Sequence, residues 1–343
     1  MSGESTQKWG NGLVELRPAG LFCPLGNFYI DPWKRVDKAL ITHAHSDHAR
    51  AGSEAYLTAQ PGVGVLSERV GKKSVIQGIP YGEMLRVGDV EVSFHPAGHV
   101  LGSGQIRIEH SGRVTVVTGD YKRHEDSSCH TMEPVKCDTF ITECTFGLPI
   151  FRWPNPREVF REMNAWWRLN QQQGRTSVMY VYSLGKAQRV LAGIDSEIGP
   201  IVVHRNIKNF LPHYEAEGFA MPEVSAVSVE NVKRVRGSGL ILVPGAAQDA
   251  VWSKHAGDIS DSSASGWMRV RGMRRWNAYD RGFVLSDHVD WDGLMQTIKD
   301  TEAEHIGATH GYTEEVVRFL REAGRDAFEV PTRFVGDSLK DEG

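Results

Sequence analysis

Residues 42–48 read Thr-His-Ala-His-Ser-Asp-His and place four metal-ligating side chains within six positions. The four are His43, His45, Asp47 and His48. They follow an apolar run that ends at Ile41 and is predicted to be a β-strand, so they lie in a loop that leaves a strand. Imidazole and carboxylate groups together suit zinc, manganese or iron. The stretch predicts a metal site; the alternative, a histidine-rich surface loop, rarely brings four such residues so close together.

Three further candidate ligands follow predicted strands in the same way. His99 lies in Ala-Gly-His-Val-Leu-Gly-Ser, Asp120 ends Thr-Gly-Asp, and His310 is the centre of Thr-His-Gly. Each stands beside a glycine at the exit of a strand, where a side chain can point into a shared cleft. Alone, each would more often be structural than functional. Together with residues 42–48 they form one set of candidate ligands.

The composition is that of an ordinary globular chain. It has 343 residues, 40% hydrophobic and 24% charged, with a net charge of −4. A length near 150 residues per domain predicts about two domains. These values exclude a disordered tail, a collagen-like chain and a coiled-coil rod. No apolar run approaches the roughly 18 residues that a membrane span needs, and residues 1–9 lack the apolar segment of a secretory signal. We therefore expect a cytoplasmic protein without membrane contact, with its four cysteines reduced.

The pattern of predicted elements changes near residue 154. Before it, short strands alternate with glycine-rich turns, which predicts two packed sheets with helices outside, one of them at 63–70. After it, strands alternate with helices, which predicts an α/β unit with a parallel sheet. The predicted strands of this part lie at 177–182, 201–204, 240–244 and 282–285, and the helices at 157–172, 186–194, 292–300 and 313–323.

The stretch 43–48 resembles the HxHxDH motif of the metallo-β-lactamase superfamily. Ile-Thr-Glu-Cys-Thr-Phe-Gly at 141–147 is similar to the acidic motif that opens the β-CASP insertion, which usually has Ser where Cys144 stands and often Tyr where Phe146 stands. Ser-Asp-His-Val-Asp at 286–290 resembles the second β-CASP motif, and His310 occupies the third. The resemblance covers essentially the whole chain. It implies an α/β fold in which a metallo-β-lactamase αββα sandwich, residues 1–154 and 281–343, carries an inserted β-CASP α/β domain at 155–280.

The same resemblance implies two divalent metal ions, zinc or manganese. Six side chains would each bind one ion: His43, His45 and His99 the first, and Asp47, His48 and His310 the second. Asp120 would bridge both ions, because a carboxylate has two oxygens to share. Asp31, in Tyr-Ile-Asp-Pro at the end of a strand, would hold a ligand imidazole in one tautomer, with a turn cap before Pro32 as its alternative.

Four residues are expected to act in catalysis, namely Asp47, Asp120, His288 and Glu143. Water activated between the two ions would attack the phosphodiester, so no protein nucleophile is required. His288 would contact the phosphate or act as general acid for the leaving sugar oxygen. Glu143 would orient His288 by a hydrogen bond and favour its charged form; a salt bridge at the strand end is the alternative.

The family resemblance implies a nuclease, and the chain looks most like the bacterial DNA-ligase-associated exonucleases. We therefore expect a metal-dependent DNA exonuclease of DNA repair, with a DNA ligase or helicase as protein partner. An RNA-processing β-CASP ribonuclease is the alternative, because histidine at the third motif is more typical of the RNA enzymes of the family. A small-molecule metallo-hydrolase and a non-catalytic scaffold are the remaining readings, and the complete ligand set argues against both.

The predicted insertion is the basic part of the chain. Residues 151–286 hold 18 Lys and Arg and 12 Asp and Glu, a net of +6, which suits a nucleic-acid channel. The predicted substrate contacts are Ser183 and Lys186, where a strand passes into a helix, and Arg269, Arg271 and Arg274, where arginines alternate with aromatic residues. An exposed basic face with tryptophans packed inward is the alternative for the arginines. Residues 121–123, directly after Asp120, are also expected to line the cleft.

Overall fold

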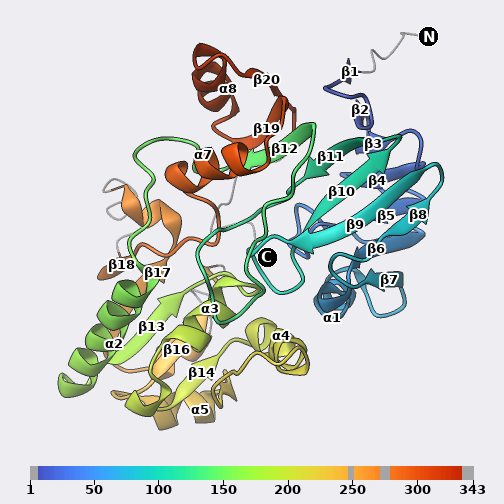
Figure 1. The fold of residues 1–343 in the computed structure, drawn as a ribbon. Helices are drawn as coiled ribbons and strands as arrows, with labels where there is room; N and C mark the ends of the chain where they lie inside the picture. The colour runs from blue at the N-terminus through green and yellow to red at the C-terminus, as the bar shows by residue number, and fades with distance from the viewer. Residues whose placement is uncertain (1–6, 246–250, 271–278, 334–343) are drawn as a thin grey trace. The chain divides into compact units, whose positions relative to one another are not determined.

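The structure, a computed structural model, describes residues 7–245, 251–270 and 279–333. The described residues divide into two compact units, one of residues 7–150 and 288–333 and the other of residues 151–287 apart from the two gaps (Figure 1). No helix in the described ranges is long and apolar enough to cross a lipid bilayer. The four cysteines all lie among the described residues, and all are free thiols.

The first sheet of the first unit has the strand order β1-β2-β3-β4-β5-β6-β7. Strands β1 to β4 pair antiparallel, and β4 to β7 pair parallel. The strands are β1 (Gln7–Lys8), β2 (Glu15–Arg17), β3 (Gly20–Cys23), β4 (Phe28–Ile30), β5 (Lys38–Leu40), β6 (Ala55–Ala59) and β7 (Val75–Ile79).

The second sheet has the order β20-β19-β12-β11-β10-β9-β8. Strands β8 to β11 pair antiparallel, whereas β11, β12, β19 and β20 are parallel neighbours. The strands are β8 (Leu85–Val87), β9 (Val90–Pro96), β10 (Gly104–His110), β11 (Arg113–Val117), β12 (Thr139–Cys144), β19 (His305–Gly311) and β20 (Asp326–Glu329).

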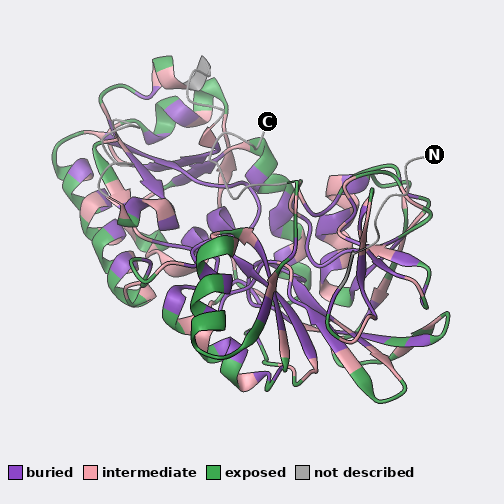
Figure 2. Cartoon of the chain, turned by 90° about the horizontal axis from the view of Figure 1, so that it is seen from above, coloured by how far each residue is buried: buried purple, intermediate pink, exposed green. Residues whose placement is uncertain are grey.

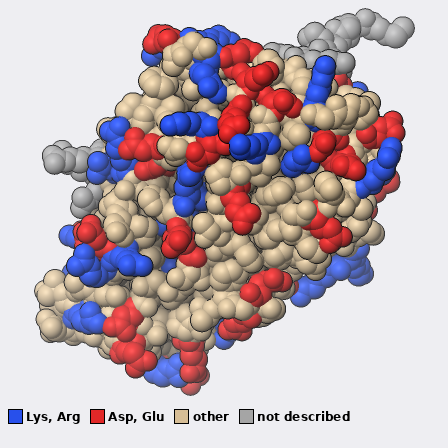
Figure 3. All heavy atoms as spheres, in the orientation of Figure 1, with Lys and Arg blue, Asp and Glu red and all other residues tan. Residues whose placement is uncertain are grey.

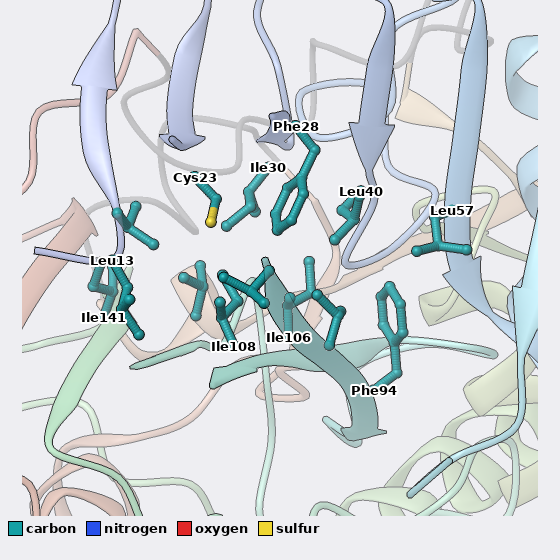
Figure 4. Packing of buried hydrophobic residues seen from close by; sticks show 14 of the residues in the cluster. Leu13, Cys23, Phe28, Ile30, Leu40, Leu57, Phe94, Ile106, Ile108 and Ile141 are labelled. Carbon is teal, nitrogen blue, oxygen red and sulfur yellow. The ribbon is translucent and has the colours of Figure 1, made fainter. Parts of the chain in front are cut away.

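Apolar side chains of the two sheets meet in one core (Figure 4). Ile106 and Ile108 lie two positions apart on β10, so both point to the same face of the sheet. They belong to the same buried cluster as Phe28 of β4 and Leu40 of β5. Full burial of one such side chain contributes about 1.5–3 kcal/mol. This shared apolar interior explains why the two sheets face each other.

Helices cover the outer faces. Strand residues such as Phe140 and Ile306 form a second buried cluster with Leu294 of α7 (Trp291–Asp300) and Val317 of α8 (Thr313–Glu322). On the first sheet, η1 (Gln60–Gly62) and α1 (Val63–Val70) contact β7. The strands are largely buried, and exposed positions gather on helices and turns (Figure 2). The unit is the αββα sandwich that the sequence predicts.

The second unit contains a six-stranded, fully parallel sheet of order β15-β14-β16-β13-β17-β18. Alternate strand residues face two different helical layers: Met179 packs with α2, α3 and α4, and Val178 with α5. The strands are β13 (Thr176–Tyr180), β14 (Ile201–Val203), β15 (Ser225–Ala226), β16 (Leu240–Val243), β17 (Ile259–Ala264) and β18 (Arg281–Phe283). The helices are α2 (Pro156–Gln172), α3 (Lys186–Gly193), η2 (Ser196–Ile198), α4 (Arg205–Ala216), α5 (Val229–Val235), η4 (Val251–His255) and η5 (Gly266–Arg269).

The limits of the second unit differ from those of the predicted insertion. The predicted insertion covers residues 155–280, whereas the unit extends from Phe151 to Asp287. The reason is that β18 pairs in parallel with β17 and so completes the sheet of this unit.

Candidate metal centre

The candidate ligands lie where strands of both sheets end. Asp31 follows β4, residues 43–48 follow β5, His99 follows β9 and Asp120 follows β11, while His310 is near the end of β19. Strands β4 and β5 are parallel, as are β11, β12 and β19. The carboxyl ends of parallel strands meet at one edge, so the topology gathers these loops.

Asp31 connects two of the predicted histidine ligands. Its Oδ2 lies 2.7 Å from Nδ1 of His48 and accepts a hydrogen bond of 2.6 Å from the Thr42 hydroxyl. The Thr42 backbone N–H donates to Oδ1 at 2.8 Å. Since the Thr42 hydroxyl donates to Asp31, it is an acceptor for Nδ1 of His43, 3.1 Å away. This network therefore holds Nδ1 of each imidazole and directs Nε2 toward the centre.

Asp120 lies at the point where these nitrogens converge. Its Oδ2 is 3.5 Å from Nε2 of His43 and 3.5 Å from Nε2 of His48. Nε2 of His99 lies 3.7 Å from the same oxygen. The side chain of Asp120 is almost fully buried. One carboxylate is thus shared by three imidazoles that come from two different sheets.

Several buried polar atoms of this centre have no hydrogen-bond partner among the described residues. They are Nε2 of His43, Nε2 of His48, Oδ1 of Asp120 and Nδ1 of His310. A buried polar atom left in this way costs about 1–3 kcal/mol. Since the histidine nitrogens and the carboxylate oxygen all offer lone pairs, a cation satisfies them together. The donor set therefore fits the metal ions implied by the family resemblance.

The first predicted ligand set is compact. Ligand atoms of His43, His45, His99 and Asp120 all lie within 4.8 Å of one another. Nδ1 of His45 is 3.1 Å from Nε2 of His99. Two nitrogens on one tetrahedral zinc lie about 3.4 Å apart, because each Zn–N bond measures about 2.1 Å. Three nitrogens and one oxygen in this arrangement suit zinc, and manganese also accepts such ligands.

The second predicted set is linked through His48. Oδ2 of Asp47 lies 3.6 Å from Nε2 of His48. The ring of His310 stacks on that of His48, with centroids 5.1 Å apart and planes 19° apart. Burial and the neighbouring His48 lower the pKa of His310 to about 4, so this imidazole is neutral at pH 7, as a metal ligand must be.

The charges of the chain alone leave Asp120 short of positive partners. Burial raises its pKa, and the nearby Glu143 adds to this, to a value of about 8 despite the opposing effect of His48. A divalent cation beside a carboxylate reverses such a shift. The electrostatics and the unpartnered atoms lead to the same conclusion: the centre is built to hold positive charge.

Glu143 and His288 form a buried pair beside this centre. Nδ1 of His288 lies 2.9 Å from Oε2 and 3.1 Å from Oε1 of Glu143. Glu143 is the penultimate residue of β12, is fully buried, and also accepts the backbone N–H of Tyr121 at 2.8 Å. Nδ1 of His288 is 3.9 Å from Oδ2 of Asp120. Nδ1 of His288 therefore faces the carboxylates of both Glu143 and Asp120.

Three known proteins are similar in sequence to this chain. A protein of Opitutus terrae described as a probable DNA ligase is 25% identical over 313 residues, 91% of this chain and 30% of its own length. Cleavage and polyadenylation specificity factor 73 of Drosophila melanogaster is 36% identical over 125 residues, 35% of this chain. Endoribonuclease ysh-1 of Neurospora crassa is 34% identical over 128 residues, 36% of this chain. These relatives and the histidine and aspartate cluster are consistent with the β-CASP group of the metallo-β-lactamase superfamily that the sequence resembles.

Two further comparisons, with protein-family models and with solved structures, complete these findings. No protein-family model matches this chain. A solved structure of a protein of unknown function from Enterococcus faecalis shares the fold, with a TM-score of 0.59, 14% identity, and coverage of 88% of this chain and 80% of the other. The chain spans 30% of the length of the probable DNA ligase and 15% of that of endoribonuclease ysh-1.

The predicted substrate contacts lie in the second unit, and their surroundings differ from one residue to the next. Ser183 is buried in the turn before α3, and Lys186, the first residue of α3, is buried with its ammonium 2.7 Å from Oδ2 of Asp287. Arg269 is exposed at the end of η5. Arg271 and Arg274 lie outside the described residues. On the face drawn in Figure 3, acidic and basic side chains are interspersed.

The prediction that residues 121–123 line the cleft is wrong. Tyr121 is fully buried in the cluster under α7 and α8. Lys122 is also fully buried, with its ammonium 2.5 Å from Oδ2 of Asp126. Arg123 pairs with Asp300 of α7 at 2.7 Å. These residues fix the loop that carries Asp120, because their side chains turn away from the centre to partners within the chain.

Sequence reasoning missed two residues that shape the centre. Thr42 links Asp31 to His43 through its hydroxyl. Ser103 Oγ accepts the backbone N–H groups of His99 and Val100, at 3.0 and 3.2 Å, and so closes the loop that carries His99. The available signal was position: Thr42 directly precedes the first histidine, and Ser103 lies four residues after His99, where hydroxyl side chains commonly cap tight loops.

Proposed function

We propose that this chain is a metal-dependent phosphodiesterase that degrades DNA from an end, in DNA repair. The observation that carries the proposal is the position of Asp120. This carboxylate is common to a compact three-histidine set and to a second set that contains His48, with Asp47 and His310 next to it. A carboxylate shared by two ligand sets is the arrangement that two-metal phosphodiester hydrolysis requires.

Each side chain then has a defined part. His43, His45 and His99 would hold one ion, and Asp47, His48 and His310 the other, with Asp120 between them. Two divalent ions, when bound, supply Lewis acidity toward the phosphate and lower the pKa of a nucleophilic water. Asp31 and Thr42 hold Nδ1 of His48 and of His43, and this orients both Nε2 atoms toward the centre before any ion arrives.

His288 is the proposed acid. Hydrolysis forms a bond from the water oxygen to phosphorus and breaks the bond from phosphorus to the sugar oxygen, which leaves needing a proton. With Nδ1 held by Glu143, a protonated His288 presents Nε2–H to that oxygen. The chain itself then supplies the proton, and Glu143 acts by orienting the imidazole and stabilising its positive charge.

The second unit is proposed as the nucleic-acid-binding insertion of residues 155–280. Its net charge in the sequence, and the turn at Ser183 that opens α3, suit phosphate groups. The predicted contacts Lys186, Arg269, Arg271 and Arg274 remain predictions. Of these, Lys186 already has Asp287 as an internal partner, so its substitution is expected to affect folding of the unit as well as binding.

DNA as substrate, and a DNA ligase as partner, are supported by the Opitutus relative. This chain aligns over 91% of its length with 30% of a protein described as a probable DNA ligase, so the two activities would act on the same DNA end. RNA cleavage is the second candidate. Relatives described as endoribonucleases match at 30–34% identity, although over 35–56% of this chain only.

The test is a cleavage assay on end-labelled single-stranded DNA and RNA of matched sequence, with Mn²⁺ or Zn²⁺. Stepwise shortening of DNA by the wild type but not by Asp120→Ala is the expected result. Preferential RNA cleavage would select the second candidate. No cleavage of either, by protein that holds two metal equivalents, would refute the nuclease proposal.

A further inference from the structure

His310 stands at an irregularity in the pairing of β12 with β19. Glu143 pairs with Thr309, but the next residue, Cys144, pairs with Gly311. His310 is therefore an extra residue on β19, a β-bulge. Bulges leave the extra residue outside the regular ladder and re-aim its side chain, and they are frequent beside active sites. The sequence alone gave no indication of this irregularity.

The backbone of this extra residue is in an uncommon conformation. His310 has φ of +55°, in the left-handed region that favours glycine. Gly311 follows with φ of +81°, and a Cβ there would lie 2.4 Å from the Cys144 carbonyl oxygen. A histidine keeps such a conformation only when its surroundings hold it. Nδ1 of the same residue is buried and without a hydrogen-bond partner among the described residues, which indicates that the conformation serves the side chain.

Cys144 supplies contacts that hold the bulge. Its Sγ lies 2.9 Å from the carbonyl oxygen of His310 and 3.4 Å from that of Thr309. Its own carbonyl accepts the backbone N–H of Tyr312 at 3.0 Å. Cys144 is fully buried. Cys144 thus bonds the chain on both sides of His310, and its thiol reaches the His310 carbonyl itself.

We propose that Cys144 is a positioning residue for His310: its thiol donates to the His310 carbonyl and keeps the imidazole turned toward His48 and Asp47. This inference rests on the proposed function in that His310 is taken as a metal ligand. A hydroxyl at this position can make the same bond, whereas a methyl group cannot. Cys144 stands where the acidic motif usually has Ser, and its thiol therefore keeps a hydrogen-bond donor at this position.

The test compares Cys144→Ser and Cys144→Ala with the wild type. Cys23→Ala is the matched control, because Cys23 is a fully buried thiol in the same unit, in the core between the two sheets. Metal-free proteins are titrated with Mn²⁺ and with Zn²⁺ against a chelator to obtain both affinities. Hydrogen exchange of the metal-free proteins is followed for the peptide over residues 305–312.

We expect Cys144→Ala to bind one metal equivalent about 10–100-fold more weakly, which is the usual effect of losing a residue that orients a ligand. Its affinity for the other metal equivalent should equal that of the wild type. Exchange over 305–312 is expected to rise in this variant alone. Cys144→Ser and Cys23→Ala should keep both affinities. The proposal is overturned if Cys144→Ala keeps both metal affinities. It is also overturned if Cys144→Ser loses as much metal affinity as Cys144→Ala, because the loss would then come from the changed side-chain volume and not from the missing hydrogen-bond donor.

The two proposals fail in different ways. A wild type that binds two equivalents and cleaves no nucleic acid refutes the nuclease, while the comparison of affinities still decides the role of Cys144. A wild type that binds one equivalent only, and keeps that affinity when His310 is replaced by Ala, overturns both the two-metal centre and the role of Cys144.

Discussion

Replacement of Asp31 by Asn is predicted to weaken both metal sites, and unequally. The carboxylate accepts three hydrogen bonds: 2.8 Å from the Thr42 N–H, 2.6 Å from the Thr42 hydroxyl and 2.7 Å from Nδ1 of His48. An amide has one acceptor oxygen. If this oxygen stays on the Thr42 N–H, the NH₂ group faces the Thr42 hydroxyl and the His48 Nδ1–H, two donors that it cannot satisfy.

The expected loss of metal affinity depends on which imidazole loses its hydrogen-bond partner. His48 loses Asp31 directly, and loss of such a partner costs 10–100-fold in metal affinity, which we place at about 100-fold here, or about 2.7 kcal/mol. His43 keeps the Thr42 hydroxyl, now less firmly anchored, so we expect about 10-fold, or about 1.4 kcal/mol, at its site. Asp31 has φ of +42°, which Asn tolerates as well as Asp, so backbone strain is unchanged.

The assay is a chelator-competition titration of metal-free protein, with metal content measured by mass spectrometry. His45→Ala, which removes a ligand of the first set only, tells the two ions apart. Thr42→Val is the control, because it breaks the bond to His43 and leaves that between Asp31 and His48. If Asp31→Asn binds both ions with wild-type affinity, the reasoning is refuted. It is also refuted if Thr42→Val weakens binding of the ion at His48 more than binding of the ion at His43.

The other predictions concern catalysis and pH. His288→Ala should reduce turnover by about 100-fold or more with both metal equivalents retained, since one general acid contributes 10²–10⁴-fold; loss of metal in this variant would contradict the assigned role. Asp120→Ala should lose activity and at least one equivalent, as measured by metal analysis after gel filtration. His204 caps α4 by accepting the Asn206 N–H at 3.2 Å, and burial together with Arg205 lowers the pKa of His204. The cap is therefore complete above about pH 6.5 and lost as pH falls below it, at a cost of about 1 kcal/mol or less in the free energy of unfolding. Urea unfolding from pH 7.5 to 5 should show this loss in the wild type and not in His204→Asn, whose amide caps at every pH.

The centre was the most predictable part of the molecule. Residues 42–48 contain four candidate ligands within one loop, and His99 and Asp120 stand beside glycines at strand ends, so the local pattern and the family resemblance together single them out. The helix at 63–70 was also predicted with its correct limits, because apolar residues recur on one face. Such features depend on neighbours in sequence, and these are visible without a structure.

Features that depend on distant partners were not predictable. β17 reads Ile-Ser-Asp-Ser-Ser-Ala, with four polar residues of six, and was not expected to be a buried strand. Two of its hydroxyls find partners in the interior: Ser262 donates to the Val178 carbonyl, and Ser260 accepts from Trp166. α4 was missed because Pro212 lies inside it. Lys122 was placed in the cleft because it closely follows Asp120, and only the fold reveals that its ammonium pairs with Asp126 in the interior.

The pairing of β12 with β19 has a consequence for the order of events during synthesis. The two strands are neighbours in the sheet, yet the whole of residues 151–287 separates them along the chain. A ribosome adds about 5–20 residues each second, so β12 waits on the order of ten seconds or more for its neighbour. Until β19 emerges, the bulge at His310 does not exist and the second set of ligands lacks a member. The nascent chain therefore carries an incomplete centre beside the messenger RNA that encodes it, and completes it only after the second unit has been made.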